Sequence, residues 1–467
     1  MFAIPGILAL VTFIYARFQE FVEVLQVVPL LHVFFALAAF GIALDMRVGH
    51  SRLKATPQFL LVALFFAWCL ITVIFSAPSN LASRALELSV CVALYLVIAH
   101  GVQSFRGLHL VSGLLVALVI LVAAVGVHQG FADKACIAVD ESIPGDVTTG
   151  KSDGRPCETP RECYLGSAEP GAHYLCEHIG LFGTTSIEKG RVRYRGVLQD
   201  PNELALAVCI GLPLVFAFAQ LPGRKLPRGA LTAVVLGLVV LCAIFTRSRG
   251  GQLVFLAVLA AYFVQRFGRR GLLAGALLAL PLLLLGGRSG ADASASTMER
   301  IDCWYEALSM WKSHPLTGVG FGQFGEYHYL TAHNSFMLTL AELGFVGMLL
   351  FSAILYVSLK IPVTLLRRIS ANVPVAVEPA ALAVFKPWAM ALVAALSGLL
   401  VGIFFLSFAY HYVLWVYVGL SGALYSAVRR HDPEFEVGFG WRDLWLVAAV
   451  DLAIIVAVFV YTHIALR

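Results

Sequence analysis

The chain has 467 residues, of which 60% are hydrophobic and only 13% are charged, and its mean hydropathy is +0.85. Its formal net charge is +5. A soluble globular domain does not need so apolar a composition. The composition therefore excludes that class and predicts a membrane protein with many spans.

Apolar runs of about 15 to 25 residues recur along the whole chain, and such runs are long enough to cross a hydrocarbon core of about 30 Å as helices. The expected spans are 4–17, 23–44, 58–76, 85–100, 108–127, 199–220, 229–246, 251–265, 271–287, 334–358, 388–408, 410–428 and 443–463. The sequence thus predicts an all-α, polytopic bundle of about 12 to 14 transmembrane helices.

The short loops between these spans predict the orientation, because Lys and Arg near helix ends favour the cytoplasmic side. "MRVGHSRLKATP", "PGRKLPRG", "QRFGRRG", "LLRRIS" and "VRRHD" fall on one side when the spans alternate. We expect the N-terminus and these loops inside, and two long loops in the periplasm. The expected divisions are helices over 1–127, a Cys-rich loop over 128–198, helices over 199–287, a catalytic loop over 288–333 and helices over 334–467.

The first long outer loop carries four cysteines without a CxxC spacing, Cys136, Cys157, Cys163 and Cys176. In an oxidising compartment this pattern favours two disulfides, with three possible connectivities, over a zinc site. We expect a small extramembrane cap.

Several arginines fall on the outer side against the charge rule, so they need a reason. They are Arg191, Arg193, Arg195, Arg247, Arg249 and Arg300. After Arg195 the chain reads Asp200-Pro201-Asn202-Glu203, which is typical of a helix start. Guanidinium groups beside the positive end of a helix suit a phosphate. The alternative for each arginine is an interaction with lipid headgroups.

The second outer loop predicts a short amphipathic helix on the membrane face. Ser296 and Glu299 have the spacing of a capping box, apolar residues follow at helical spacing, and His314-Pro315 ends the helix. A glycine-rich and aromatic-rich stretch, "LTGVGFGQFGEYHYLTAHN", comes next and ends at His333 and Asn334.

"HN" followed by nine residues and "GFVG" resembles the signature of the O-antigen ligase and O-antigen polymerase superfamily. "RGVLQDPNELA", "TRSRGG" and "HPLTGVGFGQF" resemble further segments of that family, in the same order. The resemblance covers about 191–350. It implies a GT-C-like membrane glycosyltransferase that takes a glycan from undecaprenyl pyrophosphate on the periplasmic face of the inner membrane.

The chemistry of the residues agrees with that implication. Arginines neutralise a pyrophosphate leaving group, so no metal and no cofactor is expected. We expect Arg193, Arg195, Arg247, Arg249 and Arg300 to bind the pyrophosphate, with Asn202 and Asn334 in support. An acceptor hydroxyl needs a base, and His333 is the candidate because histidine titrates near neutral pH. On one continuous helix Gly344 and Gly347 would lie near the face of His333 and admit a neighbouring helix. Glu342 would lie on the opposite face.

Two enzymatic readings share this donor. A ligase moves a finished glycan onto lipid A-core, whereas a polymerase moves a growing chain onto the next lipid-linked repeat unit, and we favour the ligase. The expected partners are the lipid-linked donor, a glycan or lipid A-core acceptor and membrane lipids, and not nucleic acid. A transporter is the alternative outside this class, but transporters place ionisable groups near the midplane.

Overall fold

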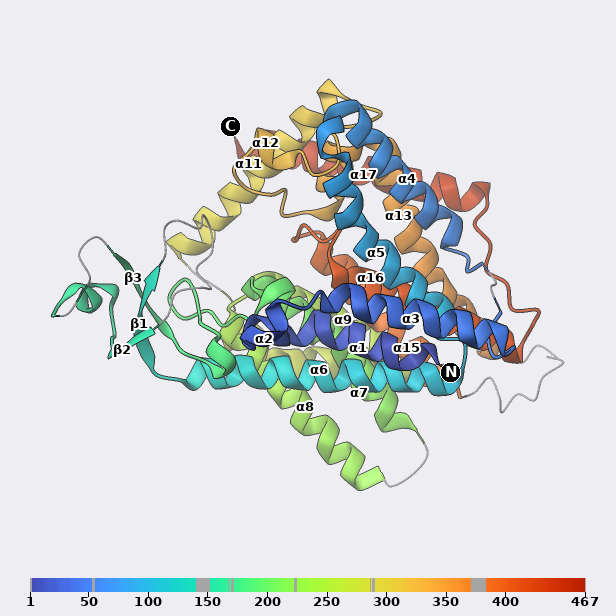
Figure 1. Ribbon diagram of the computed structural model, residues 1–467, viewed down its shortest axis with the longest axis horizontal. Coiled ribbons are helices and arrows are strands. Elements are labelled where there is room, and N and C mark those ends of the chain that lie inside the picture. Colours follow the sequence, from blue (N-terminus) through green and yellow to red (C-terminus); the bar gives the residue numbers. More distant parts are fainter. Residues whose placement is uncertain are drawn as a thin grey trace.

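The computed structural model describes residues 2–52, 55–139, 152–166, 168, 172–221, 225–285, 287, 290–370 and 384–466 (Figure 1). Ten helices in this part of the chain are long and apolar enough to cross a membrane. They are α3 (Leu30–Arg47), α4 (Phe59–Ser76), α5 (Leu81–Gly101), α6 (Phe105–Phe131), α7 (Pro201–Gln220), α8 (Lys225–Thr246), α9 (Arg249–Phe267), α13 (Ser335–Ser370), α15 (Lys386–Ile403) and α17 (Trp441–Ala465).

Three more helices complete the bundle. Two are short and apolar, and the third is buried in the middle: α1 (Ala3–Ala16), α10 (Arg270–Leu285) and α16 (Tyr412–His431). The described residues outside the bundle include the short helix α2 (Glu23–Gln26). Each of the thirteen predicted spans overlaps a helix of the bundle, so the all-α, polytopic bundle is confirmed. The span 23–44 also covers α2 and begins seven residues before α3, and the span 334–358 ends twelve residues before α13 does. The expected span 388–408 runs too far, because α15 ends at Ile403.

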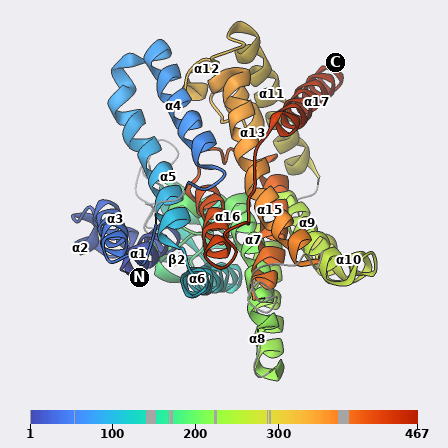
Figure 2. The ribbon, with the colours of Figure 1, turned by 90° about the vertical axis from the view of Figure 1, so that its right-hand side faces the viewer.

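The centre of the bundle is formed by helices from the middle and the C-terminal part of the chain. In the most apolar stretch of α7, 78% of residues are buried, and α13 and α15 are similar, whereas α3 has 17% and α17 has 22%. Figure 2 shows α7, α15 and α16 in the middle, with α4 and α5 on one side and α17 on the other. The peripheral helices therefore offer most of their apolar surface to lipid.

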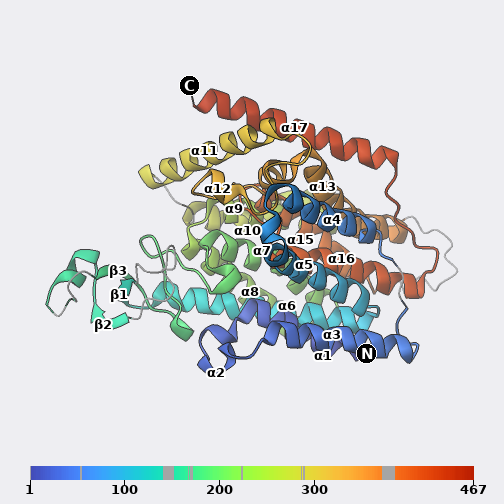
Figure 3. The same ribbon diagram turned by 45° about the horizontal axis from the view of Figure 1, so that its top comes forward.

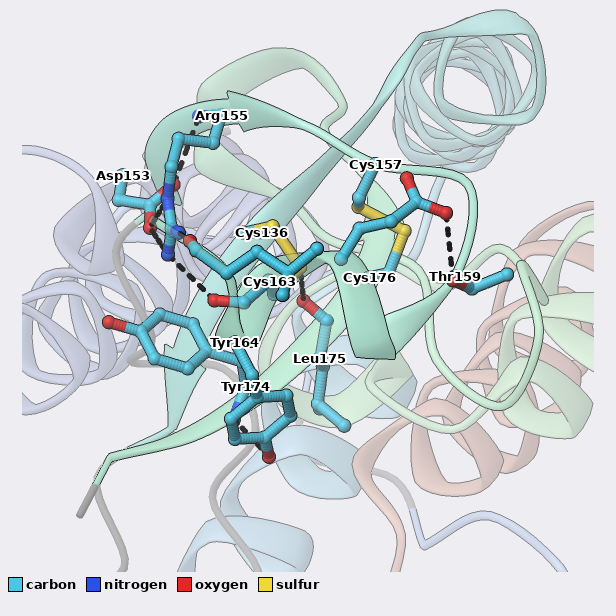
Figure 4. Close-up of a disulfide and its surroundings, with 12 residues drawn as sticks. Cys136, Asp153, Arg155, Cys157, Thr159, Cys163, Tyr164, Tyr174, Leu175 and Cys176 are labelled. Carbon is cyan, nitrogen blue, oxygen red and sulfur yellow. Dashed lines mark hydrogen bonds and ion pairs between the residues drawn. A yellow bond between two sulfur atoms is a disulfide. The ribbon is translucent and has the colours of Figure 1, made fainter. Parts of the chain in front are cut away.

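A small β-structured cap extends from the bundle beyond α6, at the left of Figure 1. Its three antiparallel strands have the order β2-β1-β3, with β1 (Lys134–Val139), β2 (Ser152–Pro156) and β3 (His173–His178). Disulfides join Cys136 to Cys163 and Cys157 to Cys176 (Figure 4). Arg155 donates to the backbone carbonyls of Cys163 and Leu165, and so ties β2 to the following turn.

We expect alkylation without reductant to leave all four cap cysteines unmodified. Tryptic cleavage after Lys151 and Arg161, combined with chymotryptic cleavage after Tyr164, places each of the four cysteines on its own peptide, so peptide mass analysis reads the connectivity. Losing one bridge should reduce the local stability of the cap by about 2–5 kcal/mol. The five remaining cysteines, all buried in the bundle or its helices, serve as the internal control because they are reduced. Four alkylated cap cysteines would contradict the pairing.

The predicted amphipathic helix is present but starts earlier than the capping box indicates. Helix α11 runs over Ala291–Ser313 with Gly290 at its N-cap, so Ser296 lies inside the helix and the capping-box start is wrong. Its apolar face, which includes Ile301, Trp304 and Leu308, is buried. This face packs on α13 and α17, and Figure 3 shows α11 beside α17.

Helix α13 is not one continuous helix, and this corrects the expected role of its glycines. Gly344 has φ +66° and ψ −170°, which breaks the helix. The glycine-rich loop enters the break: Val319 N donates to Ala341 O at 2.9 Å, and Phe345 N donates to Pro315 O at 2.9 Å. Backbone groups inside a membrane must be paired within the protein. The loop supplies partners at the break.

A side chain at position 344 would collide with the loop backbone at Leu316 and Thr317. The close approach beneath the histidine is therefore made by this loop and not by a neighbouring helix, and Gly347 faces the side chain of Leu343. The break also ends the helical phase that would have placed Gly344 on the face of His333. Glu342 accepts a hydrogen bond from Phe324 N at 3.2 Å, so its role in anchoring the loop is structural.

Candidate active site

His333 and Asn334 stand immediately before α13, at the end of the glycine-rich loop. Asn334 is buried and caps the helix, because its Oδ1 accepts from Phe336 N at 2.9 Å and from Met337 N at 3.1 Å. His333 has φ +48°, in the left-handed region. Histidine, asparagine and aspartate occupy this region more readily than other residues with a side chain. The cap and the left-handed turn together fix the direction in which the imidazole leaves the backbone.

The connection between α15 and α16 lies against this turn. Ser335 Oγ donates to Leu406 O and accepts from Phe408 N, both at 2.7 Å. Thr331 Oγ1 donates to Ser407 Oγ at 2.7 Å. These bonds hold residues 404–411 beside the histidine, so two separate loops meet at one end of the bundle.

The electrostatic surroundings of His333 keep its imidazole neutral. The side chain is half-buried, and burial lowers its pKa below the ordinary value of about 6.5. The positive charge of Arg300 lowers the pKa further, the carboxylate of Asp200 raises it, and His328 lowers it. Charges of three different segments therefore act on the imidazole. At neutral pH the ring is unprotonated and can accept a proton.

The predicted helix start after Arg195 is present. Asp200 is the N-cap of α7, Pro201 is its first residue, and Asp200 and Glu203 form a capping box. Asn202, in the first turn, accepts a hydrogen bond from Ser248 Oγ at 2.7 Å. Because Ser248 also caps α9, accepting from Gly251 N at 2.9 Å, the N-termini of α7 and α9 are joined. Two positive helix ends thus point to the same region.

Arg249 and Arg300 line a pocket of about 600 Å³ next to these helix ends. Arg249 Nη2 donates to Thr297 Oγ1 at 2.9 Å, which links α9 to α11. The remaining walls are mostly apolar and come from α9, α11, α17 and the start of the 404–411 segment. They include Leu253, Ile301, Trp304, Phe404, Phe405, Ala457, Val458 and Tyr461.

The pocket is amphipathic and lies at the lipid-facing surface. Leu253 of α9 and Tyr461 of α17 are 44% and 46% exposed, and both helices are membrane-crossing. A smaller cavity shares Gly250, Arg300 and Phe405 with the pocket and continues to Asn202. Arg300 therefore stands between the apolar pocket, the N-terminus of α7 and the histidine. This arrangement suits a ligand with a charged head and a long apolar tail.

The other predicted arginines lie differently. Arg193 is buried, and its guanidinium donates to Thr185 O and Thr185 Oγ1. Arg195 donates to Glu20 O at 3.1 Å and to Gly183 O at 2.7 Å. Arg247 is exposed in a left-handed turn directly before Ser248. None of these three is among the residues that line the described pocket.

Sequence reasoning did not assign four residues that the structure places at the site. Asp200 was recognised only as a helix cap, although its charge acts on His333. Arg191 is buried and bonded to Asn202 and to Thr246 O. Trp304 was assigned only to an apolar face, and Tyr461 belongs to a span 128 positions beyond His333 that carries no motif. Only the folded structure shows that Tyr461 lines the pocket.

The fold and the site define a multi-pass membrane protein with a lipid-facing, arginine-lined pocket beside an unprotonated histidine. Residues 232–352 match the family model of the O-antigen ligases, which confirms the resemblance read from the motifs. This segment contains Arg247, Arg249, Arg300, His333 and the broken helix at Gly344. No curated protein matches the chain. The match supports an O-antigen ligase-like function in general, with lipid-linked glycans as the class of substrate.

Proposed function

We propose that the protein transfers a glycan from undecaprenyl pyrophosphate to an acceptor hydroxyl at the periplasmic face of the inner membrane. The observation that carries this proposal is the position of Arg249 and Arg300 at the polar edge of an apolar, lipid-facing pocket beside His333. The pyrophosphate contacts the two guanidinium groups, and the start of the polyprenyl chain lies along α9, α11 and α17.

The reaction is a single displacement at the anomeric carbon of the donor sugar. The acceptor oxygen forms a bond to that carbon while the bond from carbon to the phosphate oxygen breaks. The electron pair leaves with the pyrophosphate, and the hydroxyl proton passes to the free imidazole nitrogen of His333. Arg249 and Arg300 stabilise the negative charge that develops on the leaving group. One displacement inverts the anomeric configuration.

This assignment gives the different segments of the chain distinct roles. The loop over 288–333 carries Arg300 and His333, α9 within 199–287 carries Arg249, and the bundle over 334–467 holds the loop through the break at Gly344. The cap within 128–198 lies outside the pocket lining described for Arg249 and Arg300. We infer that the cap acts on glycan access or on a partner and not on the chemical step.

Deleting the gene distinguishes the ligase, which we favour, from the alternative polymerase. Loss of a ligase should leave full-length glycan chains on undecaprenyl pyrophosphate, because the finished chain has no route to lipid A-core. Loss of a polymerase should leave single repeat units on the same carrier. Mass analysis of the extracted lipid-linked species reads the difference. Unchanged lipid-linked pools would contradict both enzymatic functions and would favour a transporter of another solute.

Cysteine labelling tests the orientation on which the periplasmic site depends. Tyr329 and Glu434 are 81% and 80% exposed, at opposite ends of the bundle. A membrane-impermeant maleimide should label Tyr329→Cys in intact spheroplasts and should label Glu434→Cys only after permeabilisation. The wild-type chain controls for background, because its free cysteines are buried. The reverse pattern would place the site in the cytoplasm and would overturn the proposed donor.

A further inference from the structure

A second polar cavity lies at the end of the bundle opposite His333. Helix α16 begins beside the active-site loops, where His411 contacts Val197 O at 2.7 Å. It ends 20 residues later at His431, a length of about 30 Å. The cavity has a volume of about 340 Å³ and is formed by the turn after α3, the end of α5 and the last turn of α16.

The lining of this cavity is basic. It consists of Gly49, His50, Arg52, Gln103, Tyr425, Ser426, Arg429, Arg430 and Pro433, with no carboxylate among the described residues. One carboxylate pairs with these arginines in the part of the chain that the structure describes: Glu436 Oε1 lies 3.7 Å from Arg429 Nη1, and the Glu436 side chain is 76% exposed. Because three arginines face a single solvent-exposed carboxylate, the cavity keeps a net positive charge.

The arginines are held in place mainly by backbone and hydroxyl groups. Glu436 pairs with Arg429, so most but not all of their positive charge is left without a carboxylate among the described residues. Arg430 Nη1 donates to His50 O at 3.3 Å, and Arg429 donates to Tyr425 Oη at 3.1 Å and to Pro433 O at 2.7 Å. The Nε of Arg429 is buried and has no partner within the described residues. Gln103 fixes the backbone of Arg52 through bonds of 3.0 and 2.9 Å.

These contacts hold several hydrogen-bond donors in fixed positions around the cavity. Arg52 and Arg430 are exposed at the rim, and Arg429 lies deeper. The hydroxyl oxygen of Tyr425 accepts a hydrogen bond from Arg429, so the hydroxyl hydrogen remains available to donate to a ligand. A phosphate group offers the oxygens that such a set requires. The cavity is larger than a phosphate alone, so it also has room for the glycerol that a phospholipid carries next to its phosphate.

We propose that this cavity binds the phosphate and glycerol of an anionic phospholipid, with Arg52, Arg429 and Arg430 as the phosphate ligands. The cavity lies at the ends of α3 and α5, which are both long and apolar enough to cross a membrane. Lipid headgroups are expected at the ends of such helices. Basic pockets between transmembrane helices at the cytoplasmic surface are suited to such headgroups. A bound lipid would tie the turn after α3 to the end of α16, two segments that Arg430 already joins by donating to His50 O.

Native mass spectrometry of the full-length, detergent-purified protein tests the site with phosphatidylglycerol, phosphatidylethanolamine and inorganic phosphate as probes. We expect phosphatidylglycerol to bind in preference to phosphatidylethanolamine. The double variant Arg52→Gln/Arg430→Gln should bind phosphatidylglycerol at least about tenfold more weakly than the wild type does. The matched control is Arg106→Gln/Arg367→Gln, which removes two exposed charges from the same end of the bundle but not from the cavity. The control should bind like the wild type.

A third variant, Arg52→Lys/Arg430→Lys, keeps the charge and should retain most of the binding. It guards against a loss that reflects misfolding, which the thermal transition of each variant also reports. Equal binding by the cavity and control variants would overturn the proposal. Binding of inorganic phosphate with the same dependence on Arg52 and Arg430, but without selective phospholipid binding, would overturn the lipid as the ligand in favour of a soluble phosphate compound.

Discussion

Replacing His333 with asparagine should leave donor binding intact and should reduce glycan transfer by about 10²–10⁴-fold, the usual size of a general-base effect. Asparagine is the suitable replacement because it also tolerates the left-handed backbone, which has φ +48° at this position. His333→Ala should lose transfer equally, but it adds backbone strain. Reconstituted protein, purified lipid-linked glycan and an acceptor provide the assay.

His328→Asn is the matched control for this prediction. His328 Nδ1 accepts from Leu330 N at 3.1 Å, and an asparagine side chain can make the same local bond. This variant should therefore keep binding, and it should keep transfer at neutral pH. Because His328 lowers the pKa of His333, its removal should move only the acid limb, to higher pH. Transfer by His333→Asn at the wild-type rate would make the histidine a structural residue and remove the proposed mechanism.

The pH dependence of transfer should also report the protonation of His333. The reactive imidazole is unprotonated, and its pKa is lowered, so the rate at saturating donor should be flat near pH 7 and should fall only in more acidic solution, below the ordinary histidine range. Asp200 raises this pKa and Arg300 lowers it. The acid limb should therefore move to lower pH in Asp200→Asn and to higher pH in Arg300→Gln. If the acid limb moved in neither variant, the group that titrates would not be His333.

Removing both pocket arginines should weaken donor binding strongly. A hydrogen bond to a charged group contributes about 1.5–3 kcal/mol, so Arg249→Gln and Arg300→Gln should each raise the KM for the donor by about 10- to 100-fold. Lysine at either position should restore only part of the affinity, because it keeps the charge but not the planar fork. The measurement is KM and kcat with purified donor at fixed acceptor.

Two further arginine variants serve as comparisons for the KM of the pocket variants. Arg161→Gln removes an exposed outer charge from the cap, outside the pocket lining, and should leave KM unchanged. Arg195→Gln loses bonds to the carbonyls of Glu20 and Gly183, so we expect it to affect stability more than KM. A chelator should not reduce transfer, since the arginines supply the positive charge. Wild-type KM in the double Arg249 and Arg300 variant would refute the pyrophosphate site.

The sequence by itself determined the class of protein and the ends of most helices. Long apolar runs have one stable solution in a membrane, the helix, so composition and run length were sufficient for the thirteen spans. The start of α7 at Asp200-Pro201 was equally local, because a capping box acts within four residues. The motif around His333 and Asn334 was also visible without the structure, because it is contiguous in the chain.

Only the tertiary structure decided which of the outer arginines share a site and what the glycines do. The sequence does not distinguish Arg195 from Arg249. In the structure Arg195 donates to the carbonyl of Gly183, whereas Arg249 donates to the hydroxyl of Thr297 on α11. The break at Gly344 depends on a loop that enters from 25 to 29 residues earlier in the chain, at Pro315 to Val319, so helical periodicity gave the wrong face. The walls of the pocket come from helices that are far apart in the sequence. No local sequence pattern distinguishes the apolar residues that line the pocket from other apolar residues of these helices. Long-range packing, and not local preference, set these features.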